Sequence, residues 1–128
     1  MNTRNWSYWV LLVIGVITII SGAVQVFWPG GELRMLEAGL TPTTAQLFAT
    51  VGMFMVLFGG VLVHSLLCGA PDPVVIVWTG WQKLGSSAAV GLGVMHHIFS
   101  PLALLVAAFD CGSGVVAFLY WYQLKRTP

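Results

Sequence analysis

The chain has 128 residues, of which 58% are hydrophobic and 7% carry a formal charge. Soluble domains usually carry about 25% charged residues, so these side chains are too few to keep a globule of this size dissolved, and a lipid bilayer is the expected solvent. The net charge of +1 gives no electrostatic basis for binding nucleic acid or an acidic partner.

Four apolar stretches follow one another along the chain. Each is close to the roughly 20 residues that a helix needs to cross the hydrocarbon of a bilayer. Turn-forming segments separate them: "WPGGELRMLEAGLTPT", "CGAPDP" and "HHIFSP". The predicted fold is an all-α, integral membrane, antiparallel four-helix bundle that forms one domain over residues 1–128. The spans are predicted at about residues 6–28, 43–67, 74–95 and 98–122.

The starts of the last three spans carry helix-capping patterns. Proline is tolerated in the first turn of a helix, and a preceding threonine, serine or aspartate can cap it. The three predicted starts are Thr41–Pro42, Asp72–Pro73 and Ser100–Pro101. In the first connection, "GGELRMLEAGL" predicts a short amphipathic segment along the membrane interface.

The first span could also be interpreted as a secretory signal peptide, because "SGA" at residues 21–23 imitates a cleavage site. However, only Arg4 precedes the apolar stretch, and that stretch continues to Trp28. We therefore expect a retained membrane span.

The basic residues predict the orientation in the membrane. Arg4, Lys125 and Arg126 flank the two termini, whereas the first connection carries only Arg34. An even number of spans places both termini on one side, and the positive-inside rule assigns that side to the cytoplasm. The expected location is a bacterial inner membrane.

Lys83 and Asp110 are the only formal charges within the predicted spans. A charge at the bilayer centre costs roughly 2.5–3.5 kcal/mol on insertion scales. Counted from opposite surfaces at about 1.5 Å per residue, both side chains lie near the midplane, on neighbouring antiparallel helices. This placement predicts an intramembrane ion pair. The pair could lock two helices in register, or it could take part directly in proton relay or headgroup binding.

The third span carries further polar and small residues around the lysine. Ser86 and Ser87 lie three and four residues after Lys83 and share its helix face. Small residues spaced by about four allow helices to approach closely in lipid. The predicted helix-packing positions are Gly85, Ala89 and Gly93, together with Gly112 in the last span.

The histidines are the remaining candidates for chemistry. His64 lies at the cytoplasmic end of the second span, whereas His96 and His97 lie at the outer end of the third. A haem held by two of them is therefore not expected, because axial ligands must share one depth. Hydrogen bonding to a quinone carbonyl or a lipid headgroup remains an alternative, with His96, His97, Gln82 and Ser86 as candidate contacts.

The two cysteines offer no metal-binding or redox site. Cys68 and Cys111 form no C-x-x-C motif and lie at different depths, so neither a metal site nor a quinone-coupled dithiol is expected.

Several segments resemble the DoxX-like group of small bacterial four-helix membrane proteins. They are "FWPGGELRMLEAGL", "TPTTAQLFATVGMFMVLFGGVLV", "WQKLGSSAAVGL" and "AAFDCGSGVVAFLYW". The resemblance implies a compact antiparallel bundle of four transmembrane helices, and it carries over only Lys83 and Asp110 as recurring polar positions. The founding relatives of the group are similar to the membrane subunit of a thiosulfate:quinone oxidoreductase.

Three functions therefore compete. The leading hypothesis is a non-catalytic accessory or structural subunit that docks against other transmembrane subunits or against a second copy of itself. The second is the membrane subunit of a quinone-linked oxidoreductase, in which Lys83, Asp110 and His97 act on a quinone headgroup. The third is a small proton-coupled carrier that uses the midplane pair as its coupling site. A quinone or a lipid is the candidate small-molecule ligand.

Overall fold

The structure is a computed structural model that describes residues 4–126. This part of the chain contains five α-helices and no strand, which confirms the all-helical prediction. The helices are α1 (Trp6–Phe27), α2 (Pro29–Met35), α3 (Pro42–Leu67), α4 (Pro73–Met95) and α5 (Ala103–Arg126). The short helix α2 lies in the connection where the sequence predicts an amphipathic segment.

Two of the three predicted helix caps are confirmed. The Thr41 hydroxyl accepts a hydrogen bond from the Thr44 N–H, and the Thr44 hydroxyl accepts one from the Thr41 N–H. At the start of α4, the Asp72 carboxylate accepts a hydrogen bond from the Val74 N–H at 2.8 Å. These side chains satisfy backbone donors that a helix start leaves without a partner.

The predicted cap at Ser100 is wrong. Helix α5 begins at Ala103, and the buried Ser100 hydroxyl has no hydrogen-bond partner within residues 4–126. The Ser100 carbonyl instead accepts a hydrogen bond from the Ala103 N–H at 3.0 Å. A tight backbone turn therefore opens the helix without a side-chain cap.

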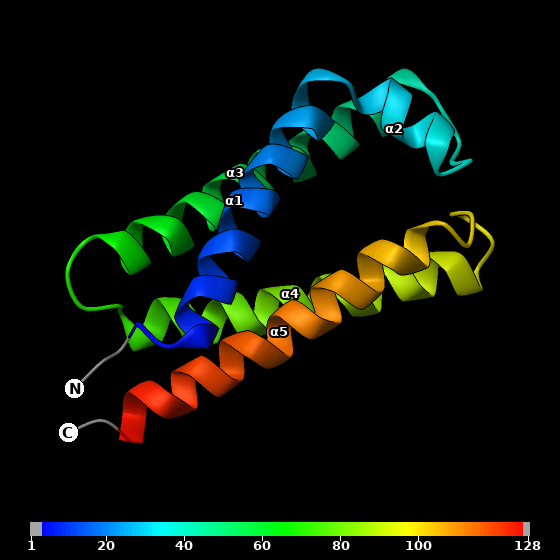
Figure 1. The fold of residues 1–128 in the computed structure, drawn as a ribbon. Helices are drawn as coiled ribbons and strands as arrows, with labels where there is room; N and C mark the ends of the chain where they lie inside the picture. Colours follow the sequence, from blue (N-terminus) through cyan, green and yellow to red (C-terminus); the bar gives the residue numbers. More distant parts are fainter. Residues whose placement is uncertain (1–3, 127–128) are drawn as a thin grey trace.

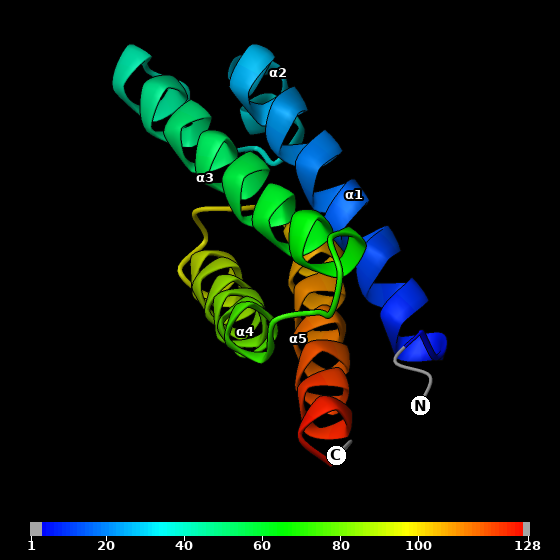
Figure 2. The same cartoon turned by 90° about the vertical axis from the view of Figure 1, so that its left-hand side faces the viewer.

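The four long helices form two antiparallel pairs. Helix α1 packs along α3, and α4 packs along α5, while contacts between the pairs are much fewer (Figure 2). The pairs meet at the end where α1 begins and α5 ends, and they diverge toward α2 (Figure 1). A hydrogen bond of 2.8 Å from the Ser100 N–H to the Leu36 carbonyl joins them again at the far end. The arrangement is more open than the compact bundle that the family resemblance implies.

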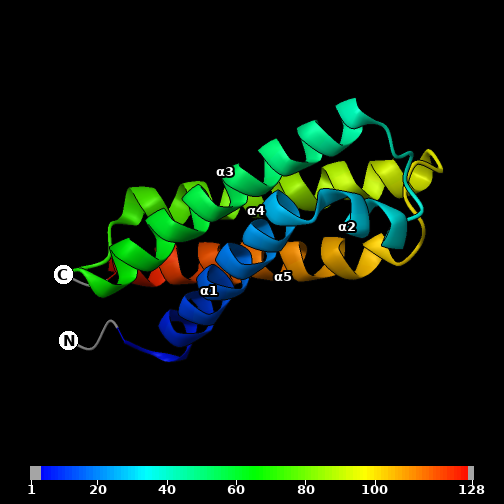
Figure 3. The same cartoon turned by 90° about the horizontal axis from the view of Figure 1, so that it is seen from above.

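The main hydrophobic core lies at the end where the two pairs meet. It contains Tyr8, Leu11, Ile14, Leu62, Leu66, Ile76, Ala117 and Tyr120, all of them buried. Next to it, the Asn5 and Ser7 side chains donate hydrogen bonds to the Gln123 side-chain oxygen at 2.7 and 2.6 Å. The start of α1 and the end of α5 are therefore held at the same end of the molecule (Figure 3).

Three helices of the described chain, α1, α3 and α5, are long and apolar enough to cross a membrane. Many large apolar side chains on the helix surfaces are exposed, including Ile20, Leu57 and Leu105. These features indicate embedding in a lipid bilayer. Helix α4 has a comparable length of 23 residues, but Gln82 and Lys83 interrupt its apolar run.

Replacing Tyr8 with phenylalanine should destabilise the closed end of the molecule. The buried Tyr8 hydroxyl donates a hydrogen bond of 2.8 Å to the Leu66 carbonyl, which lies in the last turn of α3 and has no partner within that helix. We expect a loss of about 1 kcal/mol in the free energy of unfolding, measured by SDS titration of the detergent-solubilised protein. Tyr122→Phe is the matched control, because that ring is 54% exposed, and it should change nothing measurable. Equal effects of the two substitutions would contradict the prediction.

Candidate functional site

The candidate site is a buried polar network centred on Lys83 of α4. The Lys83 ammonium lies 3.2 Å from the Asp110 carboxylate on α5, and the two side chains are 4% and 9% exposed. The same ammonium donates a hydrogen bond of 2.8 Å to the Thr18 hydroxyl on α1. Its third neighbour is the Phe109 ring, whose centroid is 5.6 Å away, within the range of a cation–π contact.

Serine residues on α4 complete the network toward α5. The Ser86 hydroxyl donates a hydrogen bond of 2.6 Å to the second oxygen of Asp110. One residue further on, Ser87 donates to the Ala107 carbonyl at 2.8 Å. Both serines lie on the helix face that carries Lys83, because they follow it by three and four residues. Each charged group of the pair therefore has a hydrogen-bonding partner besides the other charge.

Thr18 is the member of the network that sequence reasoning missed. Its hydroxyl donates to the Ile14 carbonyl of its own helix at 2.8 Å, which leaves a lone pair free to accept from Lys83. The spacing of Gly15, Thr18 and Gly22 was the available indication, since these positions share one face of a helix. Gly15 and Gly22 both lie against α3, so this face was directed toward the interior.

The network connects α1 of one helix pair to α4 and α5 of the other. Removing only one partner of a buried charge pair is strongly destabilising, by about 3–5 kcal/mol in soluble proteins. The hydrogen bonds from Lys83 and Ser86 therefore stabilise charges that would otherwise be costly inside the molecule. The network is therefore a polar contact between the two helix pairs.

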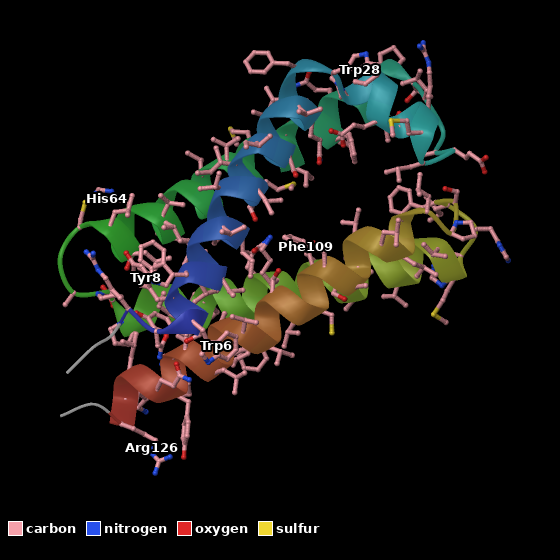
Figure 4. The ribbon with its side chains drawn as sticks, in the orientation of Figure 1. Trp6, Tyr8, Trp28, His64, Phe109 and Arg126 are labelled. Atoms are coloured by element: carbon pink, nitrogen blue, oxygen red, sulfur yellow. The ribbon has the colours of Figure 1, made fainter. Side chains whose placement is uncertain are left out.

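Two cavities flank the ion pair, one on each side. A cavity of 460 Å³ lies between α1 and α5, and a second of 530 Å³ lies between α3 and α4. Met55, Lys83 and Asp110 line both cavities. Figure 4 shows Phe109, which lines the first cavity, in the space between the two helix pairs. Most of the remaining wall is apolar.

The four residues predicted to contact a quinone or lipid headgroup do not come together. Gln82 and Ser86 line the 530 Å³ cavity near the ion pair. His96 and His97 lie just beyond the end of α4 and are exposed, and neither lines the two cavities beside Lys83. His64 lies in the last turn of α3, near the opposite end of the molecule.

The cysteines and the other possible metal ligands remain separate. Cys68 and Cys111 are exposed free cysteines; Cys68 directly follows the end of α3, whereas Cys111 lies within α5. Within the described part of the chain, no three His, Cys, Asp or Glu side chains are grouped so that they could hold a metal ion.

Gly85 and Gly112, two of the predicted helix-packing positions, do not pack against another helix of this chain. A Cβ atom added at either position would meet no atom within 4 Å. Ala89 is exposed and lines the 530 Å³ cavity together with Gly85. Gly93 is buried, but its neighbour is Phe99 in the following connection. Gly85 and Ala89 face this cavity because α4 packs against α5 through another side, at Gly80 and Leu84.

Other glycines make the close helix contacts. Gly80 packs against Phe118, and Gly114 packs against Leu84, which brings α4 and α5 together. Between α1 and α3, a Cβ at Gly22 would lie 2.6 Å from the Gly52 carbonyl oxygen. The backbones of these helices therefore approach closely where neither side chain intervenes.

Comparison with known proteins adds no relative. No protein family, curated protein or solved structure matches this chain. The resemblance to DoxX-like proteins therefore continues to rest on the sequence segments that carry it.

Proposed function

We propose that this chain is an integral membrane protein with four spans that serves as a non-catalytic accessory subunit of a larger membrane assembly. Both termini face the cytoplasm, and the expected location is a bacterial inner membrane. The single observation that carries the proposal is the closed set of interactions around Lys83 and Asp110, which leaves the buried charges engaged within the chain.

The same network supports a membrane crossing by α4. This helix has 23 residues, enough for about 30 Å of hydrocarbon. Lys83 is the main obstacle to its insertion, and Asp110 and Thr18 offset the cost of that charge. Because α4 packs along α5, it shares the depth of a helix that is itself apolar enough to cross.

A structural role for the pair explains why both of its charged groups are engaged by partners within the chain. Here the Asp110 oxygens accept from Lys83 and Ser86, and the ammonium is surrounded by three neighbours. Such a network specifies one arrangement of helices, as buried polar groups do in several known systems.

Exposed small residues support docking against further helices. Gly85 and Ala89 form a row of small residues on α4 along the 530 Å³ cavity, and Gly112 is open on α5. In lipid, small residues at a helix surface allow a neighbouring helix to approach. The occupant would be another subunit or a second copy of this chain.

Site-specific crosslinking tests the accessory-subunit proposal. A photoreactive amino acid at Gly112 should yield a crosslinked band in the native membrane, because this position is exposed. The matched control is Ala117, which lies on the same helix and is 0% exposed, and it should yield none. A protein that leaves the membrane in mild detergent as a monomer, with no crosslink from Gly112, would contradict the proposal.

A quinone-linked oxidoreductase subunit is the second candidate. One observation favours it: Lys83 and Asp110 line a cavity on each side of the pair, so a headgroup could reach them. Solvent extraction of the purified protein, followed by chromatography, should then release a quinone, and adding quinone should change the absorption spectrum. Absence of both would remove this candidate.

A further inference from the structure

Glu32 is a carboxylate that the polar network does not use. It lies on the short helix α2 at the far end of the groove between the two helix pairs, and it is partly buried. Its side chain forms no hydrogen bond or ion pair with residues 4–126. This carboxylate is therefore available to a partner from outside the chain.

The surroundings of Glu32 combine one negative charge with apolar walls. A cavity of 410 Å³ is lined by Glu32 and by Val24, Trp28, Met35, Leu36, Leu102, Leu105 and Val106. Glu32 is the only residue among these that carries a charge. The cavity shares Val24, Leu105, Val106 and Glu32 with the 460 Å³ cavity that ends at Lys83. The two cavities adjoin along these four residues and together make up the groove, and each is comparable in size to ligand pockets of about 300–1,000 Å³.

Trp28 faces the same groove as Glu32. The two residues are four positions apart, so they share one side of the α2 turn. The indole ring lies against the backbone at Gly31, where an added Cβ would overlap it. The missing side chain at Gly31 thus leaves room for the Trp28 ring at the wall of the cavity that Glu32 also lines. An aromatic face next to a carboxylate is a typical binding arrangement for organic cations.

The other charges near the groove do not neutralise Glu32. Lys83 and Asp110 line its inner end and are paired with each other. On the segment that carries Glu32, Arg34 and Glu37 are exposed and line neither part of the groove. In this region, α1 and α3 present no titratable side chain, and the nearest such groups of α4 are His96 and His97, both exposed beyond its end. The groove therefore keeps one net negative charge when Glu32 is ionised.

We propose that this groove binds a lipophilic organic cation, with its positive charge beside Glu32 and Trp28 and its apolar body along Val24, Leu105 and Val106. The argument is charge complementarity: the ionised Glu32 carboxylate would repel an anion, and a neutral amphiphile would gain nothing from the charge of this partly buried group. A cation with an apolar body satisfies both the charge and the walls.

Tetraphenylphosphonium is a suitable probe, because its charge lies within an apolar shell. Equilibrium dialysis of the purified full-length chain in non-ionic detergent should show saturable binding. Glu32→Gln should weaken that binding by about tenfold or more, which corresponds to about 1.4 kcal/mol. The matched control is Glu37→Gln, which removes an exposed carboxylate five residues away on the same connection and should leave the affinity unchanged. Tetraphenylborate has the same shape and the opposite charge, and it should not bind.

The binding should also depend on pH with a defined sign. Burial raises the pKa of Glu32 above its usual value of 4.5. The cation requires the ionised carboxylate, so its affinity should be full above the pKa and should fall as the pH is lowered through it. In the Glu32→Gln variant this dependence should disappear, whereas Glu37→Gln should keep it.

Other results would overturn the proposal. Tetraphenylborate could bind as tightly as tetraphenylphosphonium, with Glu32→Gln changing neither affinity. The groove would then be an apolar surface that binds ligands regardless of their charge. Lack of saturable binding would overturn it as well. Gly31→Ala provides a second variant, since it displaces Trp28 without touching the carboxylate, and it should weaken cation binding while the pH dependence remains. SDS titration of each variant shows whether it is folded. If Glu32→Gln does not fold, the binding measurement on Gly31→Ala still tests the proposal.

Discussion

Asp110→Ala is expected to lower the free energy of unfolding by about 3–5 kcal/mol, the usual consequence of removing one partner of a buried pair. The substitution leaves the Lys83 ammonium, whose side chain is 4% exposed, with the Thr18 hydroxyl as its remaining hydrogen-bond acceptor. It also removes the acceptor of the Ser86 hydroxyl. SDS titration or thermal unfolding in detergent measures the loss.

The double variant Lys83→Met/Asp110→Leu tests whether the pair is a structural lock. Apolar replacements of similar volume are often neutral when both charges are removed together, so most of the stability should return. Glu37→Gln controls for the loss of a carboxylate and should have little effect, because Glu37 is exposed. If the double variant folds normally and crosslinks at Gly112 as the unmodified chain does, the pair acts structurally. A stable double variant that loses a quinone-dependent activity would instead favour the oxidoreductase.

Gly22→Ala is expected to destabilise the α1–α3 pair by about 2–3 kcal/mol, at the upper end for an overpacked interface. The new methyl group would lie 2.6 Å from the Gly52 carbonyl oxygen and 2.9 Å from the Val56 amide nitrogen. Both are backbone atoms of α3, so no side-chain rotation relieves the overlap and α1 must move away. Thermal unfolding in detergent reports the change.

Gly112→Ala is the matched control for this prediction, and its expected effect has the opposite sign. A Cβ at Gly112 meets nothing within 4 Å, so only the backbone preference remains. Alanine is favoured over glycine in a helix interior by about 0.5–1 kcal/mol, and a small gain in stability follows. A Gly22→Ala variant as stable as Gly112→Ala would show that the stability of the fold does not depend on the close approach of α1 to α3.

Local features of the sequence were sufficient to predict the positions of the long helices. Hydropathy and length located the four long helices to within a few residues, except that α5 begins at Ala103. The caps at Thr41 and Asp72 were predictable because a cap is a contact between residues two or three positions apart. Lys83 and Asp110 could be paired from their depth alone, since each stands out against an apolar run. Their atoms lie 3.2 Å apart in the structure.

Contacts between distant segments could not be predicted in the same way. Gly22 and Gly85 look alike in the sequence, yet Gly22 touches a neighbouring backbone while Gly85 faces a cavity. The difference depends on which side of each helix meets another helix, and small-residue spacing on one helix does not contain that information. The role of Thr18 could not be predicted for the same reason, because Thr18 lies 65 positions from Lys83 along the chain.

The sequence by itself determined which segments are helical, which are apolar enough to enter a bilayer, and that two opposite charges lie at a common depth. These properties follow from the local chemistry of each segment. Only the tertiary structure decided that the helices form two pairs that diverge toward α2, that Glu32 and Trp28 face the groove between them, and which glycines form the interfaces. Those features depend on how whole helices are rotated and inclined against one another, and that is fixed by the sum of many weak contacts between distant residues.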